Sequence, residues 1–334
     1  MIGRREFTVG LLVPTVTRFA QAQQPGKVHR IAIVHPSRPI AMLSEAGGLP
    51  IFGAFFKQLH RLGYVEGQNL SVERYSGEGR TERYAALARD VVHSKPELIF
   101  AVSARMVQHF KATATTIPIV AYTTDPVALG LAPSLARPGS NITGVVPDVG
   151  VGFWDKQLEF LREVVPTASK VGYLTPRVLW DNPTGATIRD AAHKIGIDLL
   201  GALLESPIQE AEYRHVFTAM ARDRVDAVVV NDTPENYTYQ RLITELAKNA
   251  RLPAIYPSRS FTEVGGLMSY GADSLDLFRH AADQIAQILK GAQPGEIPFY
   301  QATKFKLTIN LNTAKVLGLA IPQSVLLRAD EIIQ

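Results

Sequence analysis

The chain has 334 residues, of which 46% are hydrophobic and 20% are charged, a globular composition that excludes a disordered chain. This length predicts two domains of about 150 residues each. The formal net charge is only +4, and Lys and Arg are not gathered into a stripe, so no nucleic-acid partner is expected. No cysteine is present, which excludes disulfides, thiolate metal sites, a cysteine nucleophile and the acylated cysteine of a lipoprotein.

The first 22 residues have the features of a cleaved export signal. Arg4-Arg5 precedes an apolar run at 8–16, and Ala20-Gln21-Ala22 matches the A-x-A pattern of a signal-peptidase site. The arginine pair resembles a twin-arginine signal, and a Sec signal is an equal alternative. The run is shorter than the ~20 apolar residues that span a membrane, and no later stretch reaches that length. We therefore expect cleavage after Ala22, a periplasmic location and no stable membrane insertion.

From Lys27 onward, short β-branched runs alternate with amphipathic stretches. The run 28–34 (VHRIAIV) is typical of a buried parallel strand, and 51–62 repeats apolar residues at helical spacing before Gly63 ends it. Such alternation predicts βαβ units and a parallel sheet. The predicted strands of this half are 28–34, 70–75, 98–102 and 117–121, and the predicted helices are 51–62, 82–92 and 105–114.

The alternation begins again after the segment NITG at 141–144. The predicted strands of the second half are 170–174, 198–204, 225–230 and 253–256, and the predicted helices are 187–195, 209–222 and 235–250. The strand, helix and strand of 96–122 have a counterpart in 225–256, which indicates two lobes of like topology. The alternative is that any two βαβ units look alike. The predicted class is α/β, with two doubly wound parallel sheets.

The residues that follow each predicted strand are the candidate site, because ligands of open parallel sheets bind beyond the carboxyl ends of the strands. These residues are hydroxyls, amides and aromatics with few titratable groups, which suits a small polar molecule. The candidate ligand-binding residues are Ser37, Ser103, Tyr122, Thr123, Thr124, Asp125, Asn231, Asp232, Tyr256 and Tyr270.

Several of these candidates have a structural alternative. Ser103 and Thr124 are expected to precede helices, where backbone N–H groups and the helix dipole favour a carboxylate. The same residue types serve as N-caps, and for Asp125 capping is the favoured interpretation, with Pro126 in the first turn of a helix.

Arg177 and Trp180, beyond the strand 170–174, are weaker candidates. The arginine could pair with a ligand carboxylate and the tryptophan could cover it. A solvated loop charge and a packing anchor are the favoured alternatives. His35, at the tip of the first strand, is likewise expected to be structural.

No motif for catalysis or for a cofactor is present. The eight histidines show no H-E-x-x-H or paired metal-ligand spacing, and the chain has neither a G-x-x-x-x-G-K-[ST] loop nor a G-x-S-x-G elbow. Carboxylate pairs occur, but nothing directs two of them to one place. We therefore expect no enzyme activity, no catalytic residue, no metal site and no cofactor.

The sequence contains an ordered set of short motifs, namely TDPV at 124–127, NITG at 141–144, GGLMSYG at 265–271, ILKG at 288–291, IN at 309–310 and AKVLG at 314–318. Together they resemble one family of ABC transporter substrate-binding proteins, which includes tryptophan-binding members. The resemblance covers nearly the whole chain after the expected export signal, roughly 28–332.

The resemblance implies the type I periplasmic-binding fold, in which two lobes are joined by three crossovers, here near 141–146, 266–272 and 299–309. The implied lobes are 27–142 plus about 270–300, and 143–268 plus about 309–334. The implied pocket draws on Ser103, Thr123, Thr124, Asp125, Asn231, Asp232 and Tyr256. The stretch 175–180 differs from that of amino-acid-binding relatives.

The implied function is that of the periplasmic solute-binding component of an ABC importer. Its ligand would be an amino acid or another small carboxylate, with aromatic ligands among the options, held between the lobes. Its partners would be the membrane permease and ATPase subunits. The alternative is a periplasmic sensing module that presents its closed form to a signalling receptor. A repressor core shares this fold, but it needs an N-terminal helix-turn-helix where the export signal stands.

Overall fold

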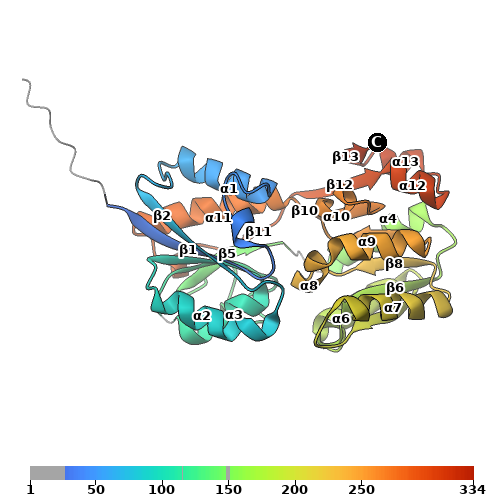
Figure 1. The fold of residues 1–334 in the computed structure, drawn as a ribbon, viewed down its shortest axis with the longest axis horizontal. Helices are drawn as coiled ribbons and strands as arrows, with labels where there is room; N and C mark the ends of the chain where they lie inside the picture. Colours follow the sequence, from blue (N-terminus) through green and yellow to red (C-terminus); the bar gives the residue numbers. More distant parts are fainter. Residues whose placement is uncertain (1–26, 115, 148–150) are drawn as a thin grey trace, which may run out of the picture.

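The structure is a computed structural model that describes residues 27–114, 116–147 and 151–334. Two β-sheets, each covered by helices on both faces, form two lobes that lie side by side (Figure 1). The expected export signal at 1–22 lies outside the described residues. Within the described ranges, no helix is long and apolar enough to cross a membrane.

The first sheet has the order β11-β5-β4-β3-β1-β2, and its neighbouring strands are parallel. Helices α1 and α11 pack on one face, and α2 and α3 pack on the other, so the central strands are buried on both faces (Figure 1). The strands are β1 (His29–His35), β2 (Leu70–Ser76), β3 (Leu98–Val102), β4 (Ile119–Tyr122), β5 (Ile142–Val146) and β11 (Tyr300–Gln301). The helices are α1 (Pro50–Arg61), α2 (Tyr84–His93), α3 (Ala104–Thr113) and α11 (Ser274–Leu289).

The second sheet has the order β13-β12-β10-β9-β8-β6-β7. One face packs against α4 and α6, and the other against α7 and α9. The strands are β6 (Lys170–Pro176), β7 (Asp198–Leu204), β8 (Ala227–Val230), β9 (Ala254–Tyr256), β10 (Met268–Ala272), β12 (Phe305–Asn310) and β13 (Glu331–Ile333). The helices are α4 (Val151–Val164), α5 (Arg177–Trp180), α6 (Pro183–Lys194), α7 (Glu210–Arg222), α8 (Pro234–Thr238), α9 (Gln240–Asn249), α10 (Arg259–Glu263), α12 (Leu311–Leu317) and α13 (Gln323–Leu326).

The two sheets share one strand order. The run β2-β1-β3-β4-β5 of the first sheet corresponds to β7-β6-β8-β9-β10 of the second. The sequence segments that echo each other form β3 and β4 in one lobe and β8 and β9 in the other. The prediction of an α/β protein with two doubly wound sheets of like topology is therefore confirmed. The one departure among the described pairings is β12, which runs antiparallel to β10.

The chain passes from one sheet to the other after β5, after β10 and after β11. The limits of the sheets differ from the expected limits of the lobes. β5 stays in the first sheet to Val146 rather than ending at 142, because it pairs with both β4 and β11. β12 begins at Phe305 rather than near 309, because it pairs with the full length of β10.

Two helix predictions are wrong. The stretch 235–250 forms α8 and α9 instead of one helix, because Tyr239 has non-helical φ and ψ angles of −100° and 20°. The break leaves α8 beside the first lobe (Figure 1). The residues after Asp125 form a turn instead of a helix, which is closed by a hydrogen bond from the Leu131 N–H to the Pro126 carbonyl.

Gly144 allows β5 to approach β4 closely. It pairs with Ala121 in the parallel register. A Cβ atom at position 144 would lie 1.9 Å from the Ala121 carbonyl oxygen, far inside van der Waals contact. Only glycine therefore fits this point of the NITG segment without separating the two strands.

β1 ends at His35, whose ring organises the turn that follows. Its Nδ1 accepts hydrogen bonds from the backbone N–H groups of Ser37 and Arg38, at 3.2 and 3.0 Å. Burial, with a smaller contribution from the Arg38 charge, lowers the pKa of His35 to about 3. The imidazole is therefore neutral, and its unprotonated Nδ1 holds the turn in place. This agrees with the structural role expected for His35.

We predict that Gly144→Ala lowers the free energy of unfolding by about 3 kcal/mol, because the new methyl group overlaps backbone that cannot move aside. Urea denaturation measures the loss. Gly152→Ala is the matched control, since position 152 in α4 is open and an added methyl group meets nothing within 4 Å. Equal stability of the two variants would contradict the close approach of β4 and β5.

A second prediction concerns pH. His35 has an ordinary pKa of 6.5 when unfolded and about 3 when folded, so between these values the unfolded state binds more protons. Stability from this group is complete above pH 6.5 and is lost as pH falls, by about 1.4 kcal/mol per pH unit. His35→Asn keeps an oxygen acceptor for the turn and does not titrate. Unfolding measured from pH 7 down to about 5 should show a shallower slope for the variant, and identical slopes would refute this assignment.

Candidate functional site

Residues that follow β1 and β3 in the first lobe contact residues that follow β8 in the second. The strand order reverses between β1 and β3, and again between β6 and β8, and ligands of doubly wound sheets bind at such switch points. Arg38 and Arg105 of the first lobe reach α9 and α8 of the second. The interface between the lobes is therefore the candidate ligand site.

Arg105 and Glu235 form a forked ion pair across this interface. Nη1 of Arg105 lies 2.8 Å from one carboxylate oxygen, and Nη2 donates to the other at 3.0 Å. The Glu235 side chain is only 5% exposed, and that of Arg105 is 30% exposed. Two parallel N–H···O bonds are the strongest form of such a pair, and they fix the orientation of both partners. The pair therefore fixes α8 against the start of α3.

Arg38 makes the second polar contact between the lobes. Its Nη2 donates to Oε1 of Gln240 at 3.0 Å, and its guanidinium carbon lies 5.6 Å from the centre of the Tyr237 ring. Burial lowers the pKa of Arg38 from its ordinary value, and the neighbouring Tyr237 opposes this effect. A neutral amide and an aromatic face are thus the described partners of this guanidinium.

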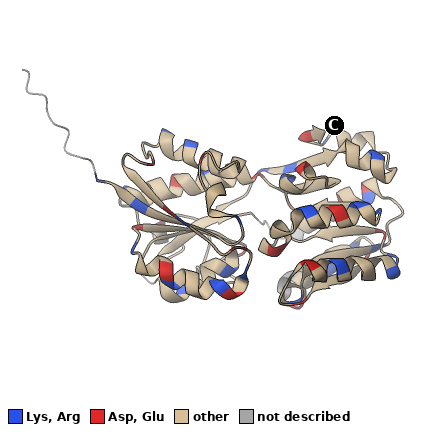
Figure 2. Cartoon of the chain, viewed as in Figure 1, with Lys and Arg blue, Asp and Glu red and all other residues tan. Residues whose placement is uncertain are grey.

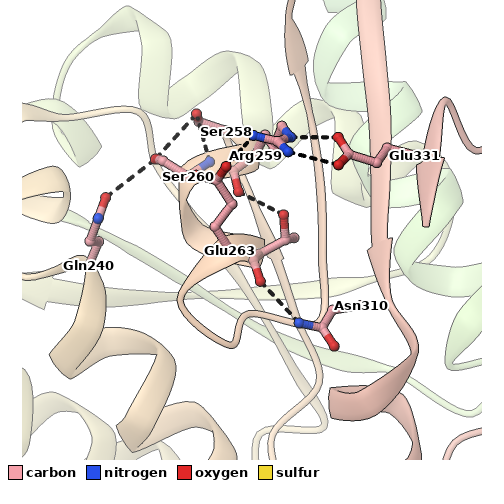
Figure 3. A network of polar contacts seen from close by, with 8 residues as sticks. Gln240, Ser258, Arg259, Ser260, Glu263, Asn310 and Glu331 are labelled. Carbon is pink, nitrogen blue, oxygen red and sulfur yellow. Dashed lines mark hydrogen bonds and ion pairs between the residues drawn. The ribbon is translucent and has the colours of Figure 1, made fainter. Parts of the chain in front are cut away.

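Gln240 is held in place within the second lobe (Figure 3). Its Oε1 accepts a hydrogen bond from the Ser260 hydroxyl at 3.3 Å, in addition to the one from Arg38. Ser260 belongs to α10, and α10 is tied to β13 by hydrogen bonds from Arg259 to Glu331 (Figure 3). The acceptor that faces Arg38 is therefore part of a connected polar network.

Two tyrosines from opposite lobes border the same part of the interface. Burial raises the pKa of Tyr122 and of Tyr237, and the charge of Asp232 adds to the effect on both. The Ser274 hydroxyl opposes this rise in the pKa of Tyr122, and the Ser258 hydroxyl opposes it for Tyr237. Both phenols stay neutral and can donate. Because Asp232 acts on both rings, this region combines a carboxylate with two aromatic faces.

Two predicted serines lie at the tips of β1 and β3. Ser37 Oγ is buried and has no hydrogen-bond partner among the described residues. Ser103 occupies the N-cap position of α3, but its side chain makes no capping bond, and its φ of 90° is one that non-glycine residues rarely adopt. Neither hydroxyl has a hydrogen-bond partner among the described residues, and each serine lies one or two positions before an interface arginine, Arg38 or Arg105.

The three predicted residues after Tyr122 are used within the first lobe. The buried Thr123 hydroxyl donates to the Thr124 carbonyl at 3.0 Å. Asp125 accepts a hydrogen bond from the Ala128 N–H at 2.9 Å, so its carboxylate caps a turn rather than the helix that the capping alternative expected. The expectation that Thr124 opens a helix is wrong, because a turn follows it. No helix terminus is therefore presented at this strand tip.

Asn231 joins the tips of β6 and β8. Its Nδ2 donates to the Thr175 hydroxyl at 2.9 Å, and its carbonyl accepts from Nδ2 of Asn236 at 2.9 Å. Asn231 itself is 6% exposed. The next residue, Asp232, is exposed and is the one that acts on the tyrosines of the interface.

In the described contacts, neither Tyr256 nor Tyr270 touches a candidate ligand-binding residue of the first lobe. Tyr256 is 1% exposed and stacks on Phe261, with 5.1 Å between ring centres. Tyr270 stacks on Phe153 and Phe305, with 5.9 and 5.8 Å between ring centres. Both tyrosines pack within the second lobe, because these aromatic neighbours cover their rings.

Arg177 and Trp180 have the structural roles that were favoured for them. Arg177 pairs with Glu205 at the surface. The guanidinium of Arg189 lies 4.5 Å from the Trp180 ring centre, and that ring packs against the core of the second lobe.

The expectation of few titratable groups at the strand tips is wrong for this interface. The interface residues that the sequence-based candidates missed are Arg38, Arg105, Glu235, Tyr237 and Gln240. The two arginines directly follow predicted strands, so their positions carried a usable signal. The other three lie in the stretch 235–250, which was predicted as one continuous helix. The separate helix α8, which carries Glu235 and Tyr237 to the interface, was therefore not anticipated.

Comparison with known proteins agrees with the two-lobed architecture. The chain is 25% identical over 268 residues to the tyrosine-binding protein of Clostridioides difficile, covering 79% of this chain and 75% of that protein. A Streptococcus pneumonia structure described as an ABC domain in complex with L-Trp superposes with a TM-score of 0.80, at 24% identity, over 92% of this chain and all of that one.

A ligand-free, open structure of a substrate-binding protein with adhesive properties from Clostridium difficile superposes with a TM-score of 0.62. It is 21% identical to this chain, of which it covers 92%, and it is itself covered completely. These likenesses show the type I periplasmic-binding fold. The family model described as "ABC transporter substrate binding protein" matches residues 40–333, which is most of the sequence. The chain therefore belongs to the ABC transporter substrate-binding protein family.

Proposed function

We propose that this protein captures an amino acid or another small carboxylate between its two lobes and delivers it, unchanged, to the permease of an ABC importer. The observation that carries the proposal is the meeting of polar strand tips from both sheets, linked by Arg105 to Glu235 and by Arg38 to Gln240. Residues from two lobes that converge on one region can hold a molecule only while the lobes are together.

The lobes are proposed to close around the ligand by a hinge motion. The connections after β5, β10 and β11 are the hinge, since the chain crosses between the sheets there. The contacts across the interface support a closed arrangement in this structure. So does the higher TM-score with the L-Trp complex, 0.80, than with the open, ligand-free relative, 0.62. A ligand favours closure only through contacts that exist in the closed form.

The class of ligand is inferred from the relatives and from the interface. The named relatives bind tyrosine and tryptophan. The rings of Tyr122 and Tyr237 offer aromatic surface, and Asp232 offers a partner for an ammonium group. Among the predicted site residues, Ser37, Ser103, Tyr122 and Asp232 are the ones this interface favours as ligand contacts. Thr123, Thr124, Asp125, Asn231, Tyr256 and Tyr270 are retained only as neighbours that shape it.

Delivery to a permease fits the family better than presentation to a receptor does. The family match covers residues 40–333 and describes a transporter component, so the sensing alternative is not favoured. The remaining expectations complete the proposal: export directed by residues 1–22, a periplasmic location, an ATPase subunit that supplies the energy, and no catalysis.

We predict that the protein retains its ligand or binds one from a defined set. Native mass spectrometry of freshly purified protein is followed by thermal unfolding with L-tyrosine, L-tryptophan, the other amino acids, and aromatic and short carboxylates. A true ligand at 100 times its Kd stabilises the folded state by about 2.7 kcal/mol, which raises Tm. Absence of both a retained ligand and any rise in Tm would count against the proposal.

We predict that Ser103→Ala weakens ligand binding about 5- to 10-fold, the effect of losing one hydrogen bond to a charged or polar ligand. The free energy of unfolding should change by less than about 0.5 kcal/mol, because the hydroxyl makes no bond within the described fold. Calorimetric titration and urea denaturation measure the two effects. Ser71→Ala, at an exposed position of β2 in the same lobe, is the control and should change neither. Unaltered affinity in Ser103→Ala would remove Ser103 from the site.

A further inference from the structure

Two arginines reach across the interface, and in the described part of the chain only one of them has an acidic partner. Arg105 is paired with Glu235. No described carboxylate lies within ion-pair distance of Arg38, whose side chain donates to the neutral amide oxygen of Gln240. A partly buried guanidinium without a countercharge is unfavourable. No described residue supplies this negative charge, and a ligand carboxylate between the lobes would supply it.

The guanidinium of Arg38 has N–H donors that its described hydrogen bond does not use. It carries five N–H groups, and the described contact with Gln240 uses one of them. The ring of Tyr237 lies 5.6 Å from the guanidinium carbon and covers one face of the group. The N–H groups at the edge of the guanidinium can therefore donate two parallel hydrogen bonds to a carboxylate, as those of Arg105 do to Glu235.

The turn that carries Arg38 is fixed before any ligand arrives. Nδ1 of His35 holds the backbone N–H groups of both Ser37 and Arg38. Ser37 Oγ, one residue before the arginine, is buried and has no partner among the described residues. A fixed backbone, a hydroxyl and a cation that have no acidic partner among the described residues together make a built anion site, because little order has to be imposed on binding.

The second lobe places an opposite charge near the same ring. Asp232 is exposed just beyond the end of β8, ahead of α8, which carries Tyr237, and it acts electrostatically on the Tyr237 ring that the Arg38 guanidinium covers. A ligand with both a carboxylate and an ammonium group matches this pair of charges in sign. A phosphate dianion matches it less well, since Asp232 would repel the second negative charge. The charges therefore favour a zwitterion.

We infer that Arg38, together with the Ser37 hydroxyl, binds the carboxylate of an α-amino acid whose ammonium group faces Asp232. The inference deepens the proposed function and rests on it, because it requires a ligand between the lobes. Arg38 would then be the residue that makes the site bind a carboxylic acid more tightly than its neutral analogue.

The test compares each amino acid with its amide, which keeps the side chain and the ammonium group and removes the negative charge. The probes are L-tyrosine and L-tyrosinamide, L-tryptophan and L-tryptophanamide, and L-leucine and L-leucinamide, titrated by calorimetry against the full chain. For the pair that binds, the wild type should prefer the acid by about 10-fold or more. Arg38→Met should weaken binding of the acid about 10- to 100-fold and that of the amide less than about 3-fold.

A second substitution and a control separate this effect from loss of structure. Arg38→Lys keeps the charge without the fork, so it should retain part of the preference, and it provides the test if Arg38→Met fails to fold. The double variant Arg105→Met/Glu235→Gln removes the other contact between the lobes. It should change the affinities for acid and amide by the same factor, because that pair is already neutralised within the protein. Circular dichroism and thermal unfolding without ligand establish that each variant is folded.

The outcomes distinguish the inference from the proposed function. Equal binding of acid and amide by the wild type, or equal loss of both in Arg38→Met, would overturn the role of Arg38 and leave the proposed function standing. A copurified ligand without a carboxylate would do the same. If only a copurified carboxylate binds, the comparison is made with that compound and its amide. No binding of any probe, with no copurified ligand, would overturn the proposed function and the inference together.

Discussion

The ion pair between Arg105 and Glu235 is the interaction on which the arrangement of the two lobes depends. The Glu235 side chain is only 5% exposed. If Arg105 of the first lobe moved away, this buried carboxylate would lose its charged partner, which is costly. A buried ion pair adds little net stability, because the cost of desolvating both charges offsets most of their attraction. What it adds is specificity, since the fork admits one orientation of α3 against α8.

A binding protein that closes on its ligand needs contacts between the lobes that are specific and weak. If those contacts favoured the closed form strongly, the ligand would add nothing to the equilibrium, because it shifts populations only by its differential affinity. Charged and amide contacts meet this requirement better than an apolar interface does. Charged residues are spread over both lobes (Figure 2). The described polar contacts between the lobes are the Arg105–Glu235 pair and the Arg38–Gln240 hydrogen bond.

The sequence predicted the regular elements well because their signal is local. The strands at 98–102 and 198–204 are found with the predicted bounds. The first is buried throughout, as its continuous apolar run indicates, whereas the second lies at the edge of its sheet and is only partly buried. It failed where a few residues decide between two local structures. Tyr239 ends one helix and begins another, and Pro126 opens a turn, although both stretches have the composition of helices. The sequence also suggested Tyr256 as a ligand contact. In the structure its ring stacks on Phe261, and this contact depends on tertiary packing rather than on a local pattern.

The charges of the interface show most clearly what sequence reading leaves out. Arg38 and Arg105 each lie three residues beyond the end of a strand, β1 and β3, although Arg38 is in a turn and Arg105 is in α3. Their difference comes from the residues they meet, which lie 202 and 130 positions away along the chain. One meets a carboxylate and forms a link between the lobes, whereas the other meets an amide and keeps its charge. The path of the chain after β8 places Glu235 opposite Arg105, and the break before α9 places Gln240 opposite Arg38. This arrangement determines which of the two arginines stays available for a ligand.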